Sequence, residues 1–280
     1  MAELRLGTSS WSEKSWVGPF YPPGTAPGDF LEYYATRFDT VEVDSTYYRV
    51  PSPSLTARWQ RILPDGFELA AKFPRSIVHG GQGASPNPEQ LLRPGIATSD
   101  RDRFLEAMSH LGSKCGPLIF QFPYFNRSVF TAAGPFLDRL DRFLRPLPPE
   151  FRYGVEIRNG RWINHKLLDL LREHRIALVL LDLVYMPDPW ELSQNLDLIT
   201  TDFVYARLVG DRKRLDTLTD RFDRVVIDQS ERIHRWAQLI ADLAPKVPKI
   251  YTYANNHFAG HGPTTVRELM AAVETVSPSS

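Results

Sequence analysis

The 280-residue chain has a single cysteine, Cys115, so neither an intramolecular disulfide nor a cysteine-based metal cluster can form. Cys115 precedes an apolar stretch without a basic neighbourhood that would activate a thiol, and we expect it to be unreactive. No apolar run approaches the roughly 18 residues of a membrane span. The opening stretch MAELRLGTSS also lacks the apolar core of a signal peptide. We therefore expect a soluble, cytoplasmic protein without membrane contact.

The chain also has no excess of positive or negative charge. Lys and Arg number 33, Asp and Glu number 33, and the formal net charge is +0. Bulk charge therefore gives no attraction to nucleic acids or membranes. Basic residues do gather locally, at 212–214 and at Arg93, Arg101 and Arg103. Such groups can contact phosphates, so a nucleic-acid-binding barrel is kept as the alternative hypothesis.

Short apolar runs, polar clusters and helical segments repeat along the chain. The runs predict strands at 5–8, 38–48, 67–72, 117–122, 152–157, 177–181, 203–208 and 249–253. Helices are predicted at 29–37, 54–62 (capped by Ser54), 101–111, 132–144, 166–174, 229–243 and 264–276, and a long loop at 73–100. Eight alternations within 280 residues favour a single-domain α/β fold, a TIM-type (β/α)8 barrel over residues 1–280. A doubly wound open sheet is the second choice, since neither a GxGxxG nor a Walker motif occurs.

The stretch 38–48, FDTVEVDSTYY, is unusual for a strand between two layers. Val41 and Val43 alternate with Glu42 and Asp44, so one face is apolar and the other acidic. A strand buried on both faces normally reads as a continuous apolar run. An apolar outer face and an acidic inner face are what a barrel with a polar mouth requires.

Polar residues also lie at the C-terminal ends of the other predicted strands. They are Lys72, Gln121, Glu156 with Arg158, Asp182, Arg207 and Asn255. The C-terminal face of a TIM barrel carries its chemistry, so we expect these side chains to converge on one pocket with Glu42 and Asp44. The competing interpretation is an internal layer of ion pairs that only neutralises buried charge.

Several motifs occur in a specific order along almost the whole chain. They are GTSSWSEKSW…FYP, FDTVEVDSTYYRVP, the segment from Lys72 to His79, GPLIFQFP, VEIRNGRW, YARLVG and YANNHFAGHGP. In this the chain resembles the bacterial and archaeal "domain of unknown function 72" family, the YecE-like proteins. The resemblance implies a TIM barrel and a site, but no particular reaction.

The resemblance also implies site residues, position by position. The matching residues are Glu42, Ser45, Lys72, Gln121, Glu156, Arg158, Trp162, Arg207, Asn255, Asn256 and His257. The chain departs from the family twice. Asn159 stands where the family often has His, and Val209-Gly210 where it often has His-Gly.

These residue types point to acid/base chemistry on a small polar ligand. Lys72, Arg158 and Arg207 suit a carboxylate or phosphate, and aromatic side chains near the strand ends, Trp11 and Tyr47 among them, suit a sugar or nucleoside. His257 is the preferred general acid or base, ahead of His79. The predicted catalytic residues are Glu42, Asp44, Lys72, Glu156, Asp182 and His257. The predicted ligand-binding residues are Trp11, Ser45, Tyr47, Gln121, Arg158, Trp162, Arg207, Asn255 and Asn256.

Three reaction classes compete. A glycosidase needs two carboxylates flanking the bond, and Glu42 with Glu156 or Asp182 could supply them. The fourth and seventh strands end in Gln121 and Arg207, however, which disfavours this class. A His-rich metal site is disfavoured because most histidines fall on or beside predicted helices. We therefore favour a cofactor-free and metal-free hydrolase, lyase or isomerase, and the alternative is a nucleic-acid or phosphodiester barrel, with or without Mg²⁺.

Overall fold

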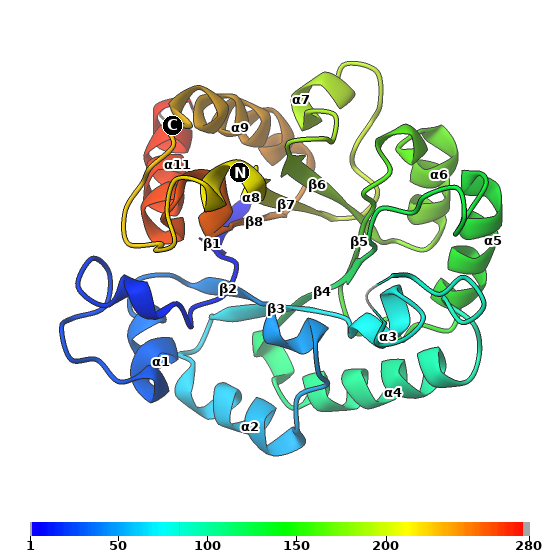
Figure 1. The fold of residues 1–280 in the computed structure, drawn as a ribbon, viewed down its shortest axis with the longest axis horizontal. Helices are drawn as coiled ribbons and strands as arrows, with labels where there is room; N and C mark the ends of the chain where they lie inside the picture. The colour runs from blue at the N-terminus through cyan, green and yellow to red at the C-terminus, as the bar shows by residue number, and fades with distance from the viewer. Residues whose placement is uncertain (1, 84, 277–280) are drawn as a thin grey trace. The chain divides into compact units, whose positions relative to one another are not determined.

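The computed structural model describes residues 2–83 and 85–276, and its eight strands form one sheet (Figure 1). The strands are β1 (Glu3–Thr8), β2 (Thr40–Val43), β3 (Glu68–Lys72), β4 (Cys115–Gln121), β5 (Tyr153–Glu156), β6 (Ala177–Leu183), β7 (Phe203–Gly210) and β8 (Lys249–Ala254). Their order in the sheet is β1-β8-β7-β6-β5-β4-β3-β2. All eight predicted strands are present, with ends shifted by a few residues.

The longer helices follow the strands in alternation. The helices are α1 (Phe30–Tyr34), α2 (Pro53–Ile62), α3 (Arg75–Val78), α4 (Ile96–Ser109), α5 (Ala133–Leu144), α6 (His165–Glu173), α7 (Pro189–Leu192), α8 (Arg212–Asp216), α9 (Ser230–Leu243), α10 (Asn256–Ala259) and α11 (Gly262–Val276). The predicted long loop at 73–100 is wrong in part, because it contains α3 and the first turn of α4. The Gly and Pro residues of this stretch favour a loop, so the sequence did not predict α3, a helix of only four residues.

The strand order confirms the TIM-type fold and excludes the doubly wound sheet. A doubly wound sheet reverses its strand order at a switch point, whereas here the strands follow the chain around and β1 lies beside β8. A parallel bridge between Ser9 and Glu42 also joins the end of β1 to β2. Gly7 permits this approach, because a Cβ there would lie 2.3 Å from the carbonyl oxygen of Thr40. A single domain over residues 1–280 stays a prediction.

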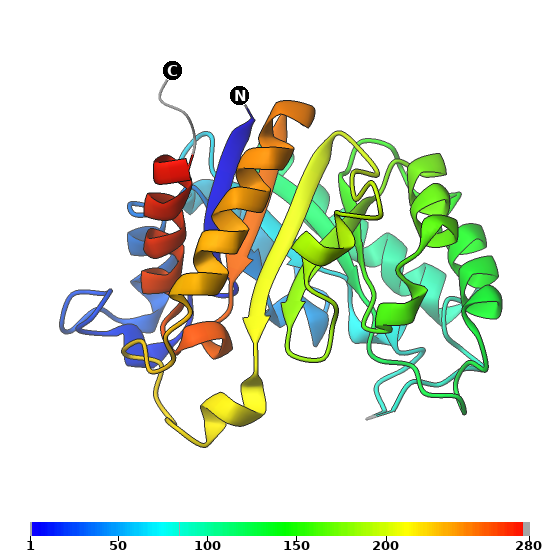
Figure 2. The same cartoon turned by 90° about the horizontal axis from the view of Figure 1, so that it is seen from above.

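The chain divides into two compact units, the first comprising residues 1–42 and 180–280. In this unit β8 pairs in parallel with both β1 and β7, from Lys249 onwards. Helices α9 and α11 pack against each other, and α11 covers β1 and β8 (Figure 2). The opposite face of β7 and β8 carries Tyr205, Tyr251 and Tyr253, all fully buried. The tyrosine rings make this face aromatic, and their hydroxyl groups make it polar.

The second unit comprises residues 43–179. Here β4 pairs in parallel with β3 and with β5, and Gln121 lies in register with Glu156. The core between strands and helices is aromatic: the rings of Phe73 and Phe120 stack with centroids 3.8 Å apart. Burial of such rings supplies a large share of the hydrophobic stabilisation of a core.

Two sequence predictions about β2 and the helix after it need correction. The predicted strand at 38–48 ends at Val43, so Asp44 does not share a strand face with Glu42. Asp44 has helical backbone angles and precedes a 3-10 turn, Ser45–Tyr47, because polar residues replace the alternating valines there. The cap of α2 is Ser52 rather than Ser54, since Pro53 already occupies the first helical turn.

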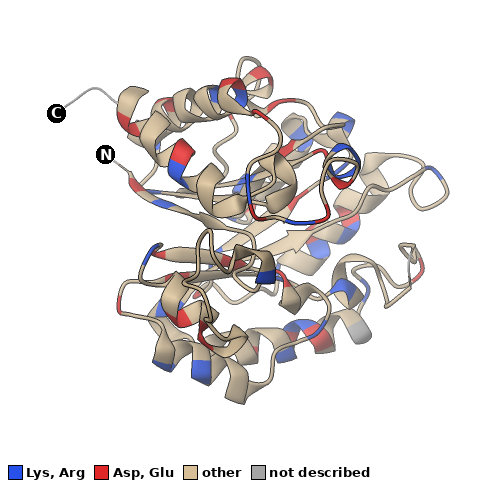
Figure 3. Cartoon of the chain, turned by 60° about the vertical axis from the view of Figure 1, so that its left-hand side comes forward, with Lys and Arg blue, Asp and Glu red and all other residues tan. Residues whose placement is uncertain are grey.

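Acidic and basic residues are interspersed on the helices, as Figure 3 shows for Lys and Arg in blue and Asp and Glu in red. In the part of the chain that the structure describes, no helix is long and apolar enough to cross a membrane.

The Ser52 cap can be tested with a matched pair of variants. The Ser52 hydroxyl accepts a hydrogen bond from the backbone N–H of Leu55 at 3.2 Å. Ser52→Ala should lower the free energy of unfolding by about 1 kcal/mol, because that N–H loses its acceptor. Ser54→Ala should lower it by less than half as much. Urea denaturation of both variants checks this, and an equal loss for the two would contradict the assignment.

Candidate functional site

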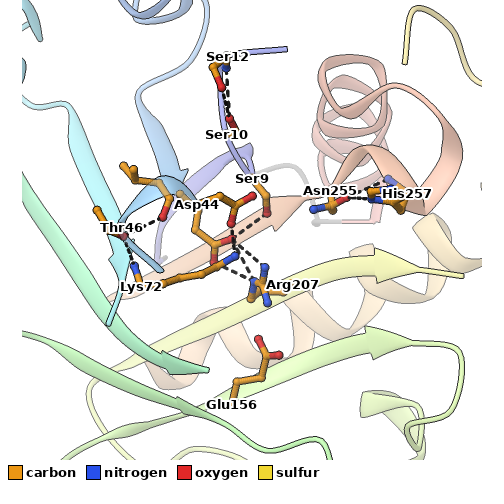
Figure 4. Close-up of polar contacts among 12 residues, drawn as sticks. Ser9, Ser10, Ser12, Asp44, Thr46, Lys72, Glu156, Arg207, Asn255 and His257 are labelled. Carbon is orange, nitrogen blue, oxygen red and sulfur yellow. Dashed lines mark hydrogen bonds and ion pairs between the residues drawn. The ribbon is translucent and has the colours of Figure 1, made fainter. Parts of the chain in front are cut away.

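In the first unit a buried carboxylate is held by three partners at the end of β2. Glu42 is fully buried, and Arg207 grips it with Nε 2.8 Å from Oε2 and Nη2 2.9 Å from Oε1 (Figure 4). The hydroxyls of Ser9 and Tyr205 donate to the same carboxylate at 2.9 and 2.7 Å. Such a two-pronged pair with added donors is the geometry in which a buried ion pair is tolerated. Glu42 and Arg207 are therefore brought together, as the strand-end pattern predicts.

Tyr205 is a hydrogen-bond donor in this cluster. Burial, followed by the negative charge of Glu42, raises the pKa of Tyr205 well above its usual value. The phenol therefore stays protonated and donates to the carboxylate. Tyr205 and Arg207 together hold the orientation of the Glu42 carboxylate.

Asp182 lies elsewhere in the same unit and faces helix α9. Its two oxygens accept from the Arg232 guanidinium at 2.8 and 3.0 Å and from the Trp236 indole N–H at 2.8 Å. Burial raises the pKa of Asp182, and Arg232 opposes that change. Both oxygens of Asp182 accept hydrogen bonds that join β6 to α9, and these bonds give the residue a structural role. A catalytic role of Asp182 stays a prediction.

Asn255, Asn256 and His257 form a turn after β8. Asn255 Oδ1 accepts from the backbone N–H of His257 at 2.9 Å and lies 2.7 Å from His257 Nδ1 (Figure 4). Asn256 Oδ1 accepts from the N–H of Gly262 at 2.9 Å. Since Asn255 Oδ1 can only accept, Nδ1 carries the proton in the neutral imidazole and Nε2 bears the lone pair. Nε2 lies 3.6 Å from Asp216 Oδ1 on α8.

In the second unit Lys72 is the buried charge at the end of β3. Its ammonium forms an ion pair with Asp44, and its backbone N–H donates to the Thr46 hydroxyl at 3.1 Å (Figure 4). Thr46 in turn donates to the carbonyl of Val43 at 3.2 Å. The strand ends of β2 and β3 are thus tied together, as their polar residues lead one to expect.

A second polar cluster in this unit joins four side chains from three strand ends. Tyr47 follows β2, Arg75 and His79 follow β3, and Arg158 follows β5. The Tyr47 hydroxyl lies 2.8 Å from His79 Nε2. Arg158 Nε donates at 2.7 Å to Glu156, whose side chain is fully buried. We call Tyr47, Arg75, His79 and Arg158 the guanidinium–imidazole cluster.

Charge and burial act on the titratable groups of this cluster. Burial lowers the pKa of His79 to about 4, and the positive charges of Arg75 and Arg158 contribute to the same change. Burial raises the pKa of Tyr47, which both arginines oppose. At neutral pH the imidazole and the phenol are therefore uncharged, and the two guanidinium groups are the cations.

Two buried nitrogen atoms of the cluster lack a hydrogen-bond partner within residues 2–83 and 85–276. They are Arg75 Nε and His79 Nδ1. Buried polar atoms without partners cost roughly 1–3 kcal/mol each, so a fold rarely keeps them without a reason. Beside the same strand ends lies a groove of about 710 Å³, bordered by Ser45, Thr46 and Pro74.

The remaining predicted ligand-binding residues have varied surroundings. Ser45 borders the groove, and Trp11 and Gln121 are each partly accessible at a strand end. Trp162 packs among Phe125, Phe130 and Phe136, with ring centroids 5.4–6.3 Å away, so its ring serves the core. A role of each in ligand binding stays a prediction.

The departure at Asn159 has a structural account. Its amide bonds both the N–H and the carbonyl of Phe125, each at 2.8 Å, and it is buried. Asn159 thus fixes the loop after β4 in this chain.

Metal-ligating and thiol side chains form no obvious reactive centre in the described part of the chain. Among the residues described, no three or more His, Cys, Asp or Glu side chains are grouped as metal ligands would be. Burial raises the pKa of Cys115 to about 12, so little thiolate exists at neutral pH, as expected for an unreactive thiol.

Comparison with known proteins identifies the family of this chain. A family model described as "Protein of unknown function DUF72" matches residues 5–279. The chain belongs to the DUF72 family. The resemblance seen in the sequence motifs is thereby confirmed, and the family description itself names no activity.

DUF72 relatives are found among curated proteins and solved structures. The chain is 33% identical over 160 residues to the UPF0759 protein YecE of Escherichia coli K12, covering 57% of this chain and 50% of YecE. It is 23% identical over 124 residues to YunF of Bacillus subtilis, covering 43% of this chain and 40% of YunF. The chain spans about half the length of the curated relatives it matches or less.

Solved DUF72 structures share the fold over nearly the full length. A DUF72 protein of Enterococcus faecalis V583 superposes with a TM-score of 0.70 at 18% identity, covering 97% of this chain and 96% of that chain. One of Thermotoga maritima MSB8 gives 0.68 at 24% identity, covering 97% and 99%. These likenesses establish the fold alone.

Sequence reasoning missed three residues of the two clusters. Ser9 and Tyr205 bond Glu42, and Arg75 belongs to the guanidinium–imidazole cluster. Tyr205 precedes Arg207 by two residues, so strand parity alone could have found it. Arg75 carries no such signal, because α3 falls inside the predicted loop.

The Glu42–Arg207 pair predicts a large stability loss on truncation. Glu42→Ala should lower the free energy of unfolding by about 3–5 kcal/mol, because Arg207 stays buried after losing its carboxylate. Glu231→Ala removes the partner of the exposed Arg235 and should cost about 1 kcal/mol or less. Guanidinium chloride denaturation of both variants measures the contrast, and similar losses would refute it.

Two buried histidines predict a stability that falls with acid. Burial lowers the pKa of His79 and of His261 from 6.5 to about 4. Between these values the unfolded chain binds more protons than the folded one, so the free energy of unfolding decreases as pH drops from about 6.5 to 4. The full loss is about 3 kcal/mol for each histidine.

Denaturation from pH 7 to 4 checks this dependence. The double variant His79→Gln/His261→Gln should flatten the slope. The control His110→Gln, at an exposed position after α4, should keep it. An unchanged slope in the double variant would exclude these two groups as its cause.

Proposed function

We propose that this DUF72 chain is an enzyme that performs acid/base chemistry on a small anionic molecule bound at the C-terminal ends of β2, β3 and β5. Arg75 and Arg158 anchor the anion in this proposal. The observation that carries it is the guanidinium–imidazole cluster with its two buried nitrogen atoms that lack partners in the described chain.

An anion suits the cluster in charge and in hydrogen bonding. Arg158 uses Nε to bind Glu156, and Arg75 Nε is buried without a partner among the described residues. A planar guanidinium binds carboxylate or phosphate oxygens with two parallel hydrogen bonds. A carboxylate or phosphate beside Arg75 would accept the unused donor and offset its charge.

Proton transfer would involve the Tyr47–His79 pair. A neutral imidazole has one donor and one acceptor nitrogen, and Nε2 already contacts the Tyr47 hydroxyl. His79 Nδ1 is thus left to face a bound ligand as donor or acceptor. An anion near the arginines would also raise the pKa of His79 towards its ordinary value, since their repulsion of the imidazolium would be offset.

Glu156 is the carboxylate that is paired with Arg158 of this cluster. It is fully buried beside Arg158, so its charge is balanced there. The reaction class that fits a guanidinium anchor, a neutral histidine–tyrosine pair and a paired carboxylate is a hydrolase, lyase or isomerase reaction on an anionic substrate.

Binding of inorganic phosphate, measured by isothermal titration calorimetry at pH 7, tests the anchor. Arg75→Gln and Arg158→Gln should each weaken binding about ten-fold or more, because each removes a charge-assisted hydrogen bond. The control Arg61→Gln, exposed on α2, should bind as the unmodified chain does.

Proton uptake supplies the second readout. Phosphate binding at pH 5.5 should take up protons as His79 gains affinity for them, and His79→Gln should abolish that uptake. Binding of phosphate that neither arginine variant weakens would overturn the proposal. Salt-dependent binding of DNA, weakened by substitution at Arg212 or Arg214, would favour the nucleic-acid alternative instead.

A further inference from the structure

A pocket rich in arginine lies between helices α4 and α5 of the second unit, apart from the strand ends. Its volume is about 430 Å³, within the range of small-molecule sites. Four arginines line it together with apolar residues: Arg93, Arg101, Arg139, Arg142, Leu92, Pro94, Phe143 and Pro146, with Thr98 beside them. We call this the α4–α5 pocket.

Arg101 is the buried member of the α4–α5 pocket. Its exposed fraction is 9%, and its Nη1 has no hydrogen-bond partner among the residues that the structure describes. Its Nε and Nη2 both contact Asp102 Oδ1 at 2.7 Å. The guanidinium lies 5.7 Å from the ring centre of Phe143. Asp102 thus holds the Arg101 guanidinium in place through Nε and Nη2, and Nη1 is left as a donor without a partner in the described chain.

The other three arginines add positive charge with little compensation. Arg139 donates to the carbonyl of Pro88, and Arg142 donates to the carbonyl of Asp138 at 2.9 Å. Neither acceptor carries a formal charge. Burial lowers the pKa of Arg139, and the neighbouring Arg93 and Arg142 lower it too, while Glu89 opposes them. The positive charges of Arg93 and Arg142 repel that of Arg139, and a bound anion would relieve this repulsion.

The apolar walls decide what kind of anion fits. Pro94 and Pro146 are exposed and give the pocket an apolar surface suited to a flat or apolar group, whereas Phe143 and Leu92 are 4% and 5% exposed. Inorganic phosphate would leave these walls uncovered. A molecule that carries both an apolar ring and phosphate groups would satisfy both parts of the pocket.

We propose that the α4–α5 pocket is a binding site for a nucleoside phosphate, with the phosphates on Arg93, Arg101, Arg139 and Arg142 and the base against Pro94 and Pro146. Arg101 Nη1 donates to a phosphate oxygen, which fills its unused position. The site is separate from the guanidinium–imidazole cluster and needs none of its residues.

Isothermal titration calorimetry of the full chain with ADP at 0.15 M salt tests this site. Saturable binding of one ADP is expected, with inorganic tripolyphosphate binding more weakly because it lacks the base. Arg139→Gln and Arg101→Gln should weaken ADP binding about ten-fold or more. The matched control Arg145→Gln, exposed at the end of α5 outside the pocket, should leave it unchanged.

Folding is controlled separately, because Arg101 is buried. Arg93→Gln, at an exposed position of the same pocket, should weaken ADP binding with no change in the thermal melting curve. Absence of saturable ADP binding, or binding that all three pocket variants retain, would overturn the proposal. Tripolyphosphate that binds as tightly as ADP would overturn the nucleoside assignment.

The two anion sites can fail independently. Arg75→Gln and Arg158→Gln should leave ADP affinity in the α4–α5 pocket unchanged. ADP binding lost only in those two variants would place the nucleotide at the guanidinium–imidazole cluster and refute the separate site.

Discussion

Burial of charge is the constraint on which the rest of this structure depends. A parallel strand covered by helices leaves no water for a carboxylate or guanidinium on its inner face, so each buried charge needs a partner. In the first unit Glu42 meets this need with Arg207, Ser9 and Tyr205. In the second, Lys72 meets it with Asp44.

The paired charges fix the strand ends and so position the turns and loops beyond them. The Glu42 cluster joins the ends of β1, β2 and β7, and the Thr46 hydroxyl links the turn after β2 to the N–H of Lys72. These contacts engage both oxygens of Glu42, whereas Arg75 and His79 each keep one buried nitrogen without a partner in the described chain. Glu42 therefore serves to hold the strand ends together, whereas Arg75 and His79 are suited to a ligand. The better candidate for a binding site is thus the guanidinium–imidazole cluster and not the acidic strand β2.

Two arrangements of arginine illustrate the same distinction outside the framework. The Arg232 guanidinium donates to Asp182 and stacks on Trp190, and so joins α9 to β6. Arg101 stacks on Phe143 but keeps Nη1 without a partner in the described chain, inside a pocket with further arginines. Stability accounts for the first arrangement. It does not account for the second, which gathers like charges.

The strand-and-helix order, the TIM-type fold and the polar strand ends could be predicted from the sequence, because period-2 alternation and turn residues are local properties of the chain. The placement of Glu42 and Arg207 near strand ends could be predicted in the same way. Partners, in contrast, are decided by the tertiary structure: Asp182 contacts α9, Trp162 packs in the aromatic core, and Tyr47 contacts His79. Partner choice depends on side chains that are distant in sequence, and no local pattern encodes those distances.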